Sequence, residues 1–441
     1  MCEWKKTIVG EFLFERVGRY KPNAEEIAGL KRIDKIDFLG NIYIAQNPSK
    51  TNMILIKPGD LVISGINVAK GAMGIYSGNE DVTATIHYSS YTFDKDQISL
   101  EYFKRFLRSP EFIKLLKEQV KGGIKTEIKP KHLLSLEISL PTLETQQKIV
   151  SHFQRIESED NELKDEIVHQ QALLKKLRQQ VLQEAIEGKL TADFRAQNPD
   201  IEPASELLAR IKAEKERLIK EGKIKKQKPL PLISEEEEPF ELPERWVWCR
   251  LGDISINSLG KMLDNQKNKG ILKPYLRNLN VQWYKVNIED LKKMPFEEHE
   301  TEKYSVRKGD IIICEGGYPG QAAIWNENYQ IMFQKALHRV RFIFSCYISE
   351  LFVHLLWLWD SNKKIHEYFT GTGIKHLTGK SLNRMIIPLP SFLEQKAIFT
   401  KVERLLTLCD QLEAQITTSK THAEQLMQAV LKEAFSQGSE A

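Results

Sequence analysis

The sequence of 441 residues lacks the features that would place it outside the cell or in a bilayer. Its five cysteines include no Cys-x-x-Cys pair, which argues against a disulfide framework and against a zinc site. Residues 1–20 contain no uninterrupted apolar segment, so no signal peptide is expected. Residues 342–359 are apolar, but Glu350 and His354 interrupt them, which favours a buried amphipathic helix over a membrane span. We therefore expect a cytoplasmic protein without membrane contact.

Motifs for nucleotide, methyl-donor or metal chemistry are also missing. Residues 373–381 approach a phosphate-binding loop, but five residues separate the glycines where four are required. No Asn/Asp-Pro-Pro-aromatic motif for amino-methylation of DNA is present. Asp310 and Glu315 are candidate metal ligands of a nuclease, yet the position that matches Glu315 in the repeat described below is Gly65. This comparison favours structural turn residues, and we predict that the chain is not an enzyme.

Composition restricts the class of protein but leaves its function open. The hydrophobic fraction of 41% and the charged fraction of 28% exclude a wholly disordered chain, and the length favours two or three domains. The net charge of +4 permits nucleic-acid binding without requiring it.

The sequence does contain a tandem repeat with an offset of 249 or 250 residues. Four stretches recur in the same order: 57–63 with 307–313, 123–125 with 373–375, 140–149 with 389–398, and 181–185 with 430–434. The constant offset implies two copies of one domain-plus-helix unit and favours a pseudo-twofold arrangement. Between the copies, residues 190–239 are rich in charge and proline, which is typical of a connector.

Each copy changes from strand-like to helical periodicity along its length. Short β-branched and aromatic runs broken by Gly, Asn and Pro predict strands, and helical stretches follow at 100–120 and 347–369. After Pro141 and Pro390 the apolar period becomes 3.5, which indicates a coiled coil. The first seam comprises Ile149, Phe153, Ile156, Leu163, Ile167, Leu174, Leu177 and Val181. Its copy lies 249 residues later. The two seams are expected to pack together, and the alternative is that each packs on its own globular domain.

The predicted fold class is α+β, with two tandem mixed α/β domains separated by two long coiled-coil helices in a pseudo-twofold repeat. The predicted limits are 1–143 for the first domain, 144–190 for the first long helix, 191–240 for a charged connector, 241–392 for the second domain and 393–441 for the second long helix.

Loops suited to DNA recognition follow the repeated Gly-Asp strand in both copies. Glycine lets a backbone approach a groove closely, and Asn, Gln, Arg and Glu side chains can pair with base edges. The candidates of the first copy are Ser64, Asn67, Lys70 and Lys125. Those of the second copy are Glu315, Tyr318, Gln321, Arg339 and Lys375, with a separate polar cluster of Arg277, Asn278, Asn280 and Gln282. Lys70, Lys125, Lys375 and Arg339 are expected near phosphates or bases, whereas an exposed turn is the alternative for the polar cluster.

Several motifs together resemble the specificity (S) subunits of Type I restriction-modification systems, and the resemblance covers essentially the whole chain. The motifs are Leu-Pro-Glu-Arg-Trp at 242–246, Leu-Gly-Asp-Ile at 251–254, Gly-Asp-Ile at 309–311, Leu389-Pro390 followed by Glu394-Gln395, and Gly-Lys-Leu-Thr-Ala at 188–192. Residues 207–215 are also similar to the central region of that family. The first copy departs from the pattern, with Thr145-Gln146 where Glu-Gln is usual.

The resemblance implies a non-catalytic subunit whose two target-recognition domains each bind one half of a bipartite site in double-stranded DNA. It also implies that the two helices pack antiparallel, set the spacing of the half-sites and dock two methylation (M) subunits. Restriction (R) subunits would complete the complex. S-adenosylmethionine, ATP and magnesium are expected on these partners, and no cofactor or metal is expected in this chain. An enzyme acting on DNA and a helical scaffold without nucleic acid remain the competing classes.

Overall fold

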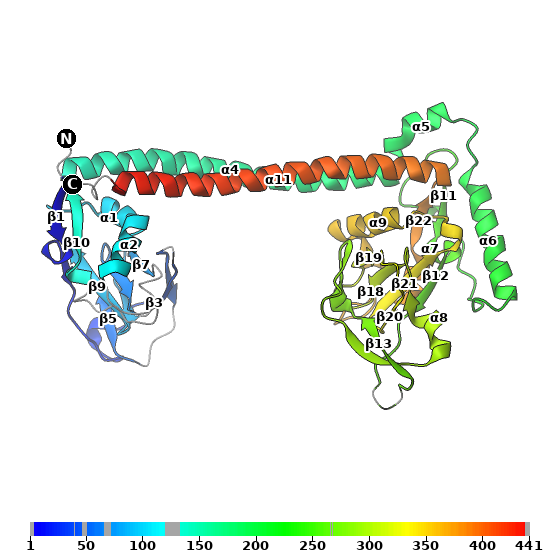
Figure 1. Ribbon diagram of the computed structural model, residues 1–441, viewed down its shortest axis with the longest axis horizontal. Helices are drawn as coiled ribbons and strands as arrows, with labels where there is room; N and C mark the ends of the chain where they lie inside the picture. Colours follow the sequence, from blue (N-terminus) through cyan, green and yellow to red (C-terminus); the bar gives the residue numbers. More distant parts are fainter. Residues whose placement is uncertain are drawn as a thin grey trace. The chain divides into compact units, whose positions relative to one another are not determined.

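The computed structural model describes residues 4–436 except 39, 46–50, 66–71, 120–132, 265 and 267. The chain divides into two compact units, of which unit 1 comprises 1–170 with 415–441 and unit 2 comprises 171–414. Two long helices, α4 (Leu143–Ile186) and α11 (Phe392–Ser436), contribute to both units (Figure 1). The rest of each unit is a mixed α/β domain.

The described part of unit 1 contains two four-stranded sheets, ordered β2-β9-β6-β7 and β4-β3-β8-β5, and a ribbon of β1 with β10. The strands are β1 (Trp4–Ile8), β2 (Leu13–Glu15), β3 (Arg32–Ile36), β4 (Ile42–Ala45), β5 (Met53–Ile56), β6 (Leu61–Ser64), β7 (Met73–Ile75), β8 (Val82–Thr85), β9 (Tyr88–Phe93) and β10 (Glu137–Pro141). The helices are α1 (Leu100–Phe106) and α2 (Pro110–Gln119), with 3-10 turns η1 (Val9–Glu11) and η2 (Glu25–Ile27). The single helix expected at 100–120 is divided because Ser109 accepts a hydrogen bond from the backbone N–H of Phe112 and Pro110 begins α2.

Unit 2 repeats this plan in its described residues, with sheets β12-β21-β18-β19 and β16-β13-β20-β17 and the ribbon of β11 with β22. A short hairpin of β14 and β15 is added. The strands are β11 (Val247–Arg250), β12 (Ser255–Leu259), β13 (Ile271–Leu276), β14 (Val281–Gln282), β15 (Lys285–Val286), β16 (Lys292–Phe296), β17 (Ser305–Val306), β18 (Ile311–Cys314), β19 (Ala322–Ile324), β20 (Ile331–Phe333), β21 (Leu337–Phe342) and β22 (Ile386–Leu389).

The helices of unit 2 are α5 (Ala192–Gln197), α6 (Ala204–Lys220), α7 (Leu251–Ile254), α8 (Thr301–Tyr304), α9 (Ser349–Ser361) and α10 (Gly379–Arg384). Its 3-10 turns are η4 (Lys189–Thr191), η5 (Glu235–Glu237), η6 (Asn278–Asn280), η7 (Glu298–Glu300), η8 (Ile343–Ser345) and η9 (Lys364–Tyr368). The apolar run at 342–359 thus supplies the buried helix α9, whose residues join the core of this unit. No helix in the described ranges is both long enough and apolar enough to cross a bilayer. The matching sheet orders of the two units confirm the predicted α+β class and its internal repeat.

The repeated Gly-Asp pair forms the same turn in both units, and its aspartate is buried. The two glycines have φ values of +89° and +87°, which side-chain-bearing residues rarely adopt. Asp60 accepts a hydrogen bond from Nε of Arg16 at 2.6 Å, and Asp310 accepts one from Nε of Arg341 at 2.6 Å. Asp60 and Asp310 are 3% and 2% exposed. Each aspartate therefore joins the turn to a neighbouring strand, and Asp310 has a structural role that needs no metal.

The helices α4 and α11 run antiparallel within each unit. In unit 1, Phe153 near the start of α4 stacks on Phe435 near the end of α11, with ring centroids 5.8 Å apart. In unit 2, Arg178 near the end of α4 donates to Asp410 at 2.7 Å and to Glu413 at 2.8 Å. Phe153 and Phe435 also belong to the core of the unit 1 domain. Of the predicted seam, Phe153, Ile167, Leu174 and Val181 are buried, whereas Leu163 and Leu177 are 41% and 45% exposed. The helices pack on each other and on the globular domains, so both packing alternatives hold in part.

A glutamine at the start of each long helix anchors that helix to the domain before it. The amide of Gln146 donates to the carbonyl of Pro141 at 2.9 Å, and its oxygen accepts from the backbone N–H of Ser99 at 2.7 Å. Gln395 repeats this pattern by donating to Pro390 at 3.1 Å and accepting from Ile348 at 3.0 Å. These shared contacts explain why glutamine occurs at this position in both copies.

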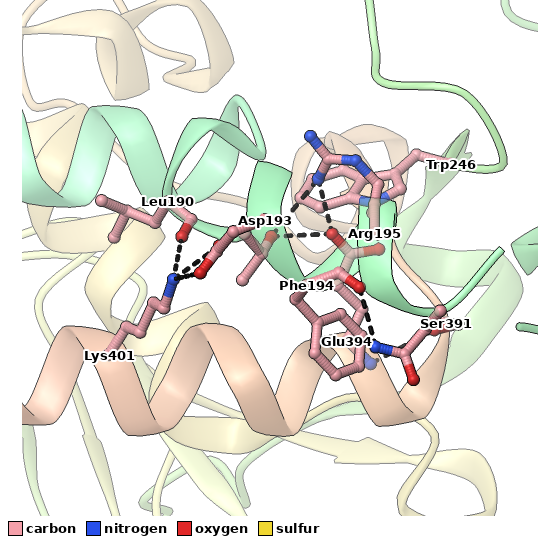
Figure 2. Close-up of polar contacts among 10 residues, drawn as sticks. Leu190, Asp193, Phe194, Arg195, Trp246, Ser391, Glu394 and Lys401 are labelled. Carbon is pink, nitrogen blue, oxygen red and sulfur yellow. Dashed lines mark hydrogen bonds and ion pairs between the residues drawn. The ribbon is translucent and has the colours of Figure 1, made fainter.

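The neighbouring residue differs between the copies, and that of the second copy contacts the connector. Glu394 is 2% exposed, and its carboxylate accepts hydrogen bonds from Thr191 at 2.7 Å, Arg195 at 2.6 Å and the indole of Trp246 at 2.8 Å (Figure 2). We call this group the Glu394 clamp. The corresponding residue of the first copy, Thr145, instead accepts a hydrogen bond from the hydroxyl of Thr142 at 3.1 Å.

The Glu394 clamp also fixes the turn that follows α4. Gly188 has φ +70°, and a Cβ atom there would lie 2.6 Å from Cγ of Pro243. Two turns further along α11, Lys401 donates to the carbonyl of Leu190 at 2.8 Å and to the carboxylate of Asp193 at 2.7 Å (Figure 2). The beginning of the connector is therefore folded against α11.

Replacing Glu394 with alanine should lower the free energy of unfolding of unit 2 by about 2–4 kcal/mol, because the buried hydroxyl of Thr191 and the buried indole of Trp246 would lose their acceptor. The measurement is thermal unfolding of the full chain followed by tryptophan fluorescence. Glu144→Gln, which breaks only an exposed pair with Lys148, is the matched control and should leave the midpoint unchanged. Equal midpoints for both variants would show that the clamp contributes no stability.

Candidate nucleic-acid interface

The structure describes little of the loops predicted to bind DNA in unit 1. Asn67, Lys70 and Lys125 lie outside the described residues. Ser64 ends strand β6, is 7% exposed, and has its backbone N–H bonded to the carbonyl of Ala72 at 3.0 Å. Its side chain therefore belongs to the buried part of the domain.

In unit 2, three separate segments meet and form one surface. They are residues 278–282, the turn at 315–321 and the loop at 370–377, and we call them the three-loop surface. The amide of Asn278 donates to the carbonyl of Gly316 at 3.4 Å, and the backbone N–H of Leu377 donates to the carbonyl of Glu315 at 2.8 Å. Gln321 joins the first two segments by donating to the carbonyl of Val281 at 3.2 Å. The structure thus brings together candidates that are up to about a hundred residues apart in sequence.

Two glycines of this surface lie close to side chains of the neighbouring loops. Gly317 has φ +80°, and a Cβ atom there would lie 2.6 Å from Nδ2 of Asn278. A Cβ atom on Gly316 would lie 3.0 Å from Nδ1 of His376. The expected reason for these glycines was approach to a DNA groove, but close packing of the loops already accounts for them.

A buried histidine on the sheet contacts the third loop, residues 370–377. His338 on β21 is 1% exposed, and its Nε2 lies 2.9 Å from the carbonyl oxygen of Leu377. Burial lowers the pKa of His338, which favours the neutral ring with Nε2–H donating to that carbonyl. The loop therefore rests on the sheet through a hydrogen bond that a neutral imidazole can make.

Two residues of the predicted polar cluster are occupied by contacts within the protein. Arg277 donates to the carboxylate of Asp290 at 2.6 Å, and its side chain is 12% exposed. Asn280 is 3% exposed and donates to the carbonyl of Asn287 at 2.9 Å. Both residues therefore shape the first segment of the three-loop surface, and their side chains are less exposed than the alternative of an exposed turn expected.

Arg339 requires a correction of its expected role. It is 4% exposed on β21, where its guanidinium donates to the carbonyl of Ser305 and, at 3.2 Å, to that of Glu302. Burial lowers the pKa of Arg339 to about 10. Sequence reasoning placed Arg339 at a strand end beside DNA, but almost every position of β21 is buried, and this argues for a structural role.

The remaining candidates are accessible on the three-loop surface. Tyr318 is 66% exposed, Gln282 and Lys375 are exposed, and Asn278 and Glu315 are half-buried. Sequence reasoning did not single out three further residues of these loops: His376, Leu279 and Ile374. Ile374 could have been predicted, because it belongs to the Gly-Ile-Lys stretch that is repeated at 123–125 and 373–375.

A cavity of about 710 Å³ lies elsewhere in unit 2, between the helix pair and α9. Its lining includes none of the residues predicted to bind DNA. Nδ1 of His354 lies 3.2 Å from the hydroxyl of Tyr284, and its Nε2 lies 3.4 Å from the carboxylate of Glu403. Burial is the main cause that lowers the pKa of His354. Within the described ranges, no three metal-ligating side chains are grouped in a way that could hold an ion.

Comparison with known proteins identifies the family. Residues 243–419 match the model of the Type I restriction modification DNA specificity domain. The specificity subunit of the Type I restriction enzyme EcoAI from Escherichia coli is 30% identical over 383 residues, which are 74% of this chain and 62% of that protein. This chain belongs to the Type I specificity family. The EcoEI specificity subunit, also from E. coli, is 30% identical over 273 residues, which are 58% of this chain and 44% of that protein. The matches thus span less than two thirds of either relative.

Solved structures share the fold of this Type I specificity chain. A chain from a structure of a type I restriction-modification system superposes with a TM-score of 0.64 at 14% identity, covering 99% of this chain and 98% of that one. The HsdS subunit from Thermoanaerobacter tengcongensis gives a TM-score of 0.53 at 16% identity, with coverage of 98% and 96%. At these identities the likeness concerns the fold alone.

The residues that carry the Type I family resemblance have structural roles here. Trp246 and Glu394 form the clamp, and Asp310 closes the turn before β18. None of these three residues lies on the three-loop surface. The family motifs therefore describe the framework that holds the loops, and they leave the loops themselves free to differ.

Proposed function

We propose that this chain is the DNA-recognition subunit of a Type I restriction-modification complex and catalyses no reaction itself. Each mixed α/β domain, at 1–143 and 241–392, would bind one half of a bipartite target in double-stranded DNA. The observation that carries the proposal is the repeated sheet topology, which presents loops of different sequence on the same framework. A protein that reads two unlike half-sites needs this combination.

The chemistry of the accessible loop residues supports contact with DNA. Exposed amides such as that of Gln282 can donate to and accept from an adenine edge, and Lys375 can neutralise a phosphate. The segment at 317–320 is Gly-Tyr-Pro-Gly, whereas the matching residues 67–70 of the first copy are Asn-Val-Ala-Lys. Different side chains at equivalent positions would give the two domains different base preferences.

The helix pair supplies a surface for protein partners. In unit 2, Leu173 and Leu177 on α4 and Leu408 and Leu412 on α11 are 45–49% exposed, and each pair is one helical turn apart. Such apolar stripes are typical of surfaces that pack against a partner helix. We assign this stretch to a methylation subunit and the equivalent stretch of unit 1 to a second one. Restriction subunits would join that assembly, which would work in the cytoplasm.

The cofactors of the assembly would belong to these partners. S-adenosylmethionine would bind the methylation subunits, and ATP and magnesium would serve the partner subunits during restriction. The role proposed for this chain requires no bound cofactor, because it consists of positioning the partners on the correct DNA sequence.

Methylation mapping tests the proposed function directly. The chain is expressed with its methylation subunits in a host that has no other DNA methylation, and modified bases are mapped by long-read sequencing. We expect one bipartite sequence to become methylated, and we expect no methylation when this chain is omitted. Turnover of DNA by the purified chain alone would favour an enzyme instead. An absence of DNA affinity even with the partners present would favour a helical scaffold.

A further inference from the structure

Three large apolar side chains are exposed on the three-loop surface, one from each loop. Leu279 is 67% exposed, Tyr318 is 66% exposed and Ile374 is 74% exposed. Single exposed apolar residues are common on proteins, but three on adjoining loops are a group that a binding partner would cover.

The contacts between the loops place these three residues around one junction. Leu279 directly follows Asn278, whose amide donates to the carbonyl of Gly316. Tyr318 lies two residues after Gly316, and Ile374 lies two residues before His376, whose ring faces Gly316. Each apolar side chain therefore flanks the same junction.

Tight turns hold at least two of these side chains in position. Ile374 lies in a loop closed by a pair of backbone hydrogen bonds between Thr370 and His376, at 2.8 Å and 2.9 Å. Gly371 in that loop has φ +98°, and a Cβ atom there would lie 2.3 Å from the carbonyl oxygen of Ile374. Leu279 belongs to the 3-10 turn η6, where its N–H donates to Oδ1 of Asn278 at 3.0 Å. The turns thus fix the backbone beneath Leu279 and Ile374 before any partner binds.

The groups around this apolar patch indicate which partner it fits. Asn278 and Gln282 provide amides, and Lys375 provides a positive charge directly after Ile374. The major groove of DNA offers the matching combination, because the C5-methyl group of thymine lies there beside hydrogen-bonding base edges. The minor groove presents no methyl group and distinguishes fewer base pairs.

We propose that Leu279, Tyr318 and Ile374 contact thymine methyl groups in the half-site bound by unit 2, and that this contact is part of how the domain selects A·T pairs. The inference rests on the proposed function and extends it to a chemical feature of the target. Tyr318 belongs to the segment that differs between the copies, so it contributes to what unit 2 alone prefers. Ile374 belongs to the repeated Gly-Ile-Lys and makes a contact that both copies can share.

The test compares thymine with uracil, which lacks the C5-methyl group and keeps the same hydrogen-bonding edge. Duplexes with the mapped target are made with one thymine at a time replaced by uracil. Binding to the assembled complex with its methylation subunits is then measured by fluorescence anisotropy at one salt concentration. We expect at least one position in the unit 2 half-site to lose about fourfold in affinity, which corresponds to one buried methyl group. Any loss of affinity caused by uracil in the other half-site should be unaffected by substitution of these three residues.

Variants of Tyr318 show whether this side chain contributes to the loss. Tyr318→Ala should bind thymine and uracil equally at a position that this side chain contacts, whereas Tyr318→Phe should keep the discrimination of the natural chain. Leu232→Ala removes a side chain in the connector that is 93% exposed, and it should behave as the natural chain does. The triple alanine variant of Leu279, Tyr318 and Ile374 should lose all discrimination in this half-site.

Two results would overturn the inference and are distinct from failure of the proposed function. The first is a complex that prefers its mapped sequence but tolerates uracil at every position. The second is discrimination that persists in the triple variant. A complex without any preference for the mapped sequence would overturn the proposed function, and this inference with it.

Discussion

Exchanging the second recognition domain for that of a relative should replace one half of the methylated sequence and leave the other half and the spacer unchanged. The structure sets the limits of the exchange. Trp246 donates to Glu394, and β11 pairs with β22, so these parts should stay with the recipient. Residues 255–385 carry the remaining strands, α9 and the three-loop surface, and they are the segment to exchange.

The measurement is methylation mapping of the hybrid in complex with its methylation subunits. An exchange of 241–388, which also replaces Trp246, is the informative comparison. If the donor lacks this indole, the yield of folded protein should fall, but the half-site bound by the exchanged domain should be the same as with the shorter exchange. If the exchange of 255–385 altered the bases of both half-sites, the two domains would not be independent readers of DNA.

Inserting seven residues into both long helices should lengthen the unread spacer of the target by about three base pairs. Seven residues are two turns of the 3.5-residue repeat, so the apolar seam keeps its register. They add roughly 10 Å to a helix at about 1.5 Å per residue. At about 3.4 Å per base pair, this length corresponds to about three base pairs. The half-site bases should stay the same.

The antiparallel packing determines where these insertions belong. They are placed after Gln170 in α4 and after Thr417 in α11, so that Arg178 can still meet Asp410. Insertion into one helix alone should separate either this pair or Phe153 from Phe435, and it should reduce assembly, so it serves as the control. An insertion after Glu187 would instead fall beyond the end of α4, in the turn held by the Glu394 clamp. An unchanged spacer in an active double-insertion complex would show that the helices do not set the distance.

The framework of this protein could be predicted from sequence because it depends on patterns that repeat. The offset of 249 or 250 residues predicts two copies, and the 3.5-residue period predicts both long helices. The break between α1 and α2 was missed, although Ser109-Pro110 is a recognisable start signal for a helix. Periodicity over a long window hides such local signals.

The candidate site was harder to predict because burial and contacts between distant segments decide which of its side chains are accessible. Arg339 and Asn280 have side chains suited to DNA, yet both are buried and bonded to backbone carbonyls. Leu279 and Ile374 were passed over because apolar residues in a sequence are usually assigned to a core. The folded chain shows that both side chains are exposed, and the hydrogen bond from Asn278 to the turn at 315–321 brings their loops together.

The Glu394 clamp also has a consequence for how the duplicated chain folds. Both long helices begin with the same glutamine anchor, so an α11 helix docked at the wrong end would still find equivalent partners for Gln395. Glu394 would then lose Thr191 and Arg195, which belong to the connector and follow α4 directly. Losing these charge-assisted hydrogen bonds costs about 1.5–3 kcal/mol each, so the misdocked state is disfavoured. One residue that differs between the copies therefore helps two halves of the same fold to assemble in a single order.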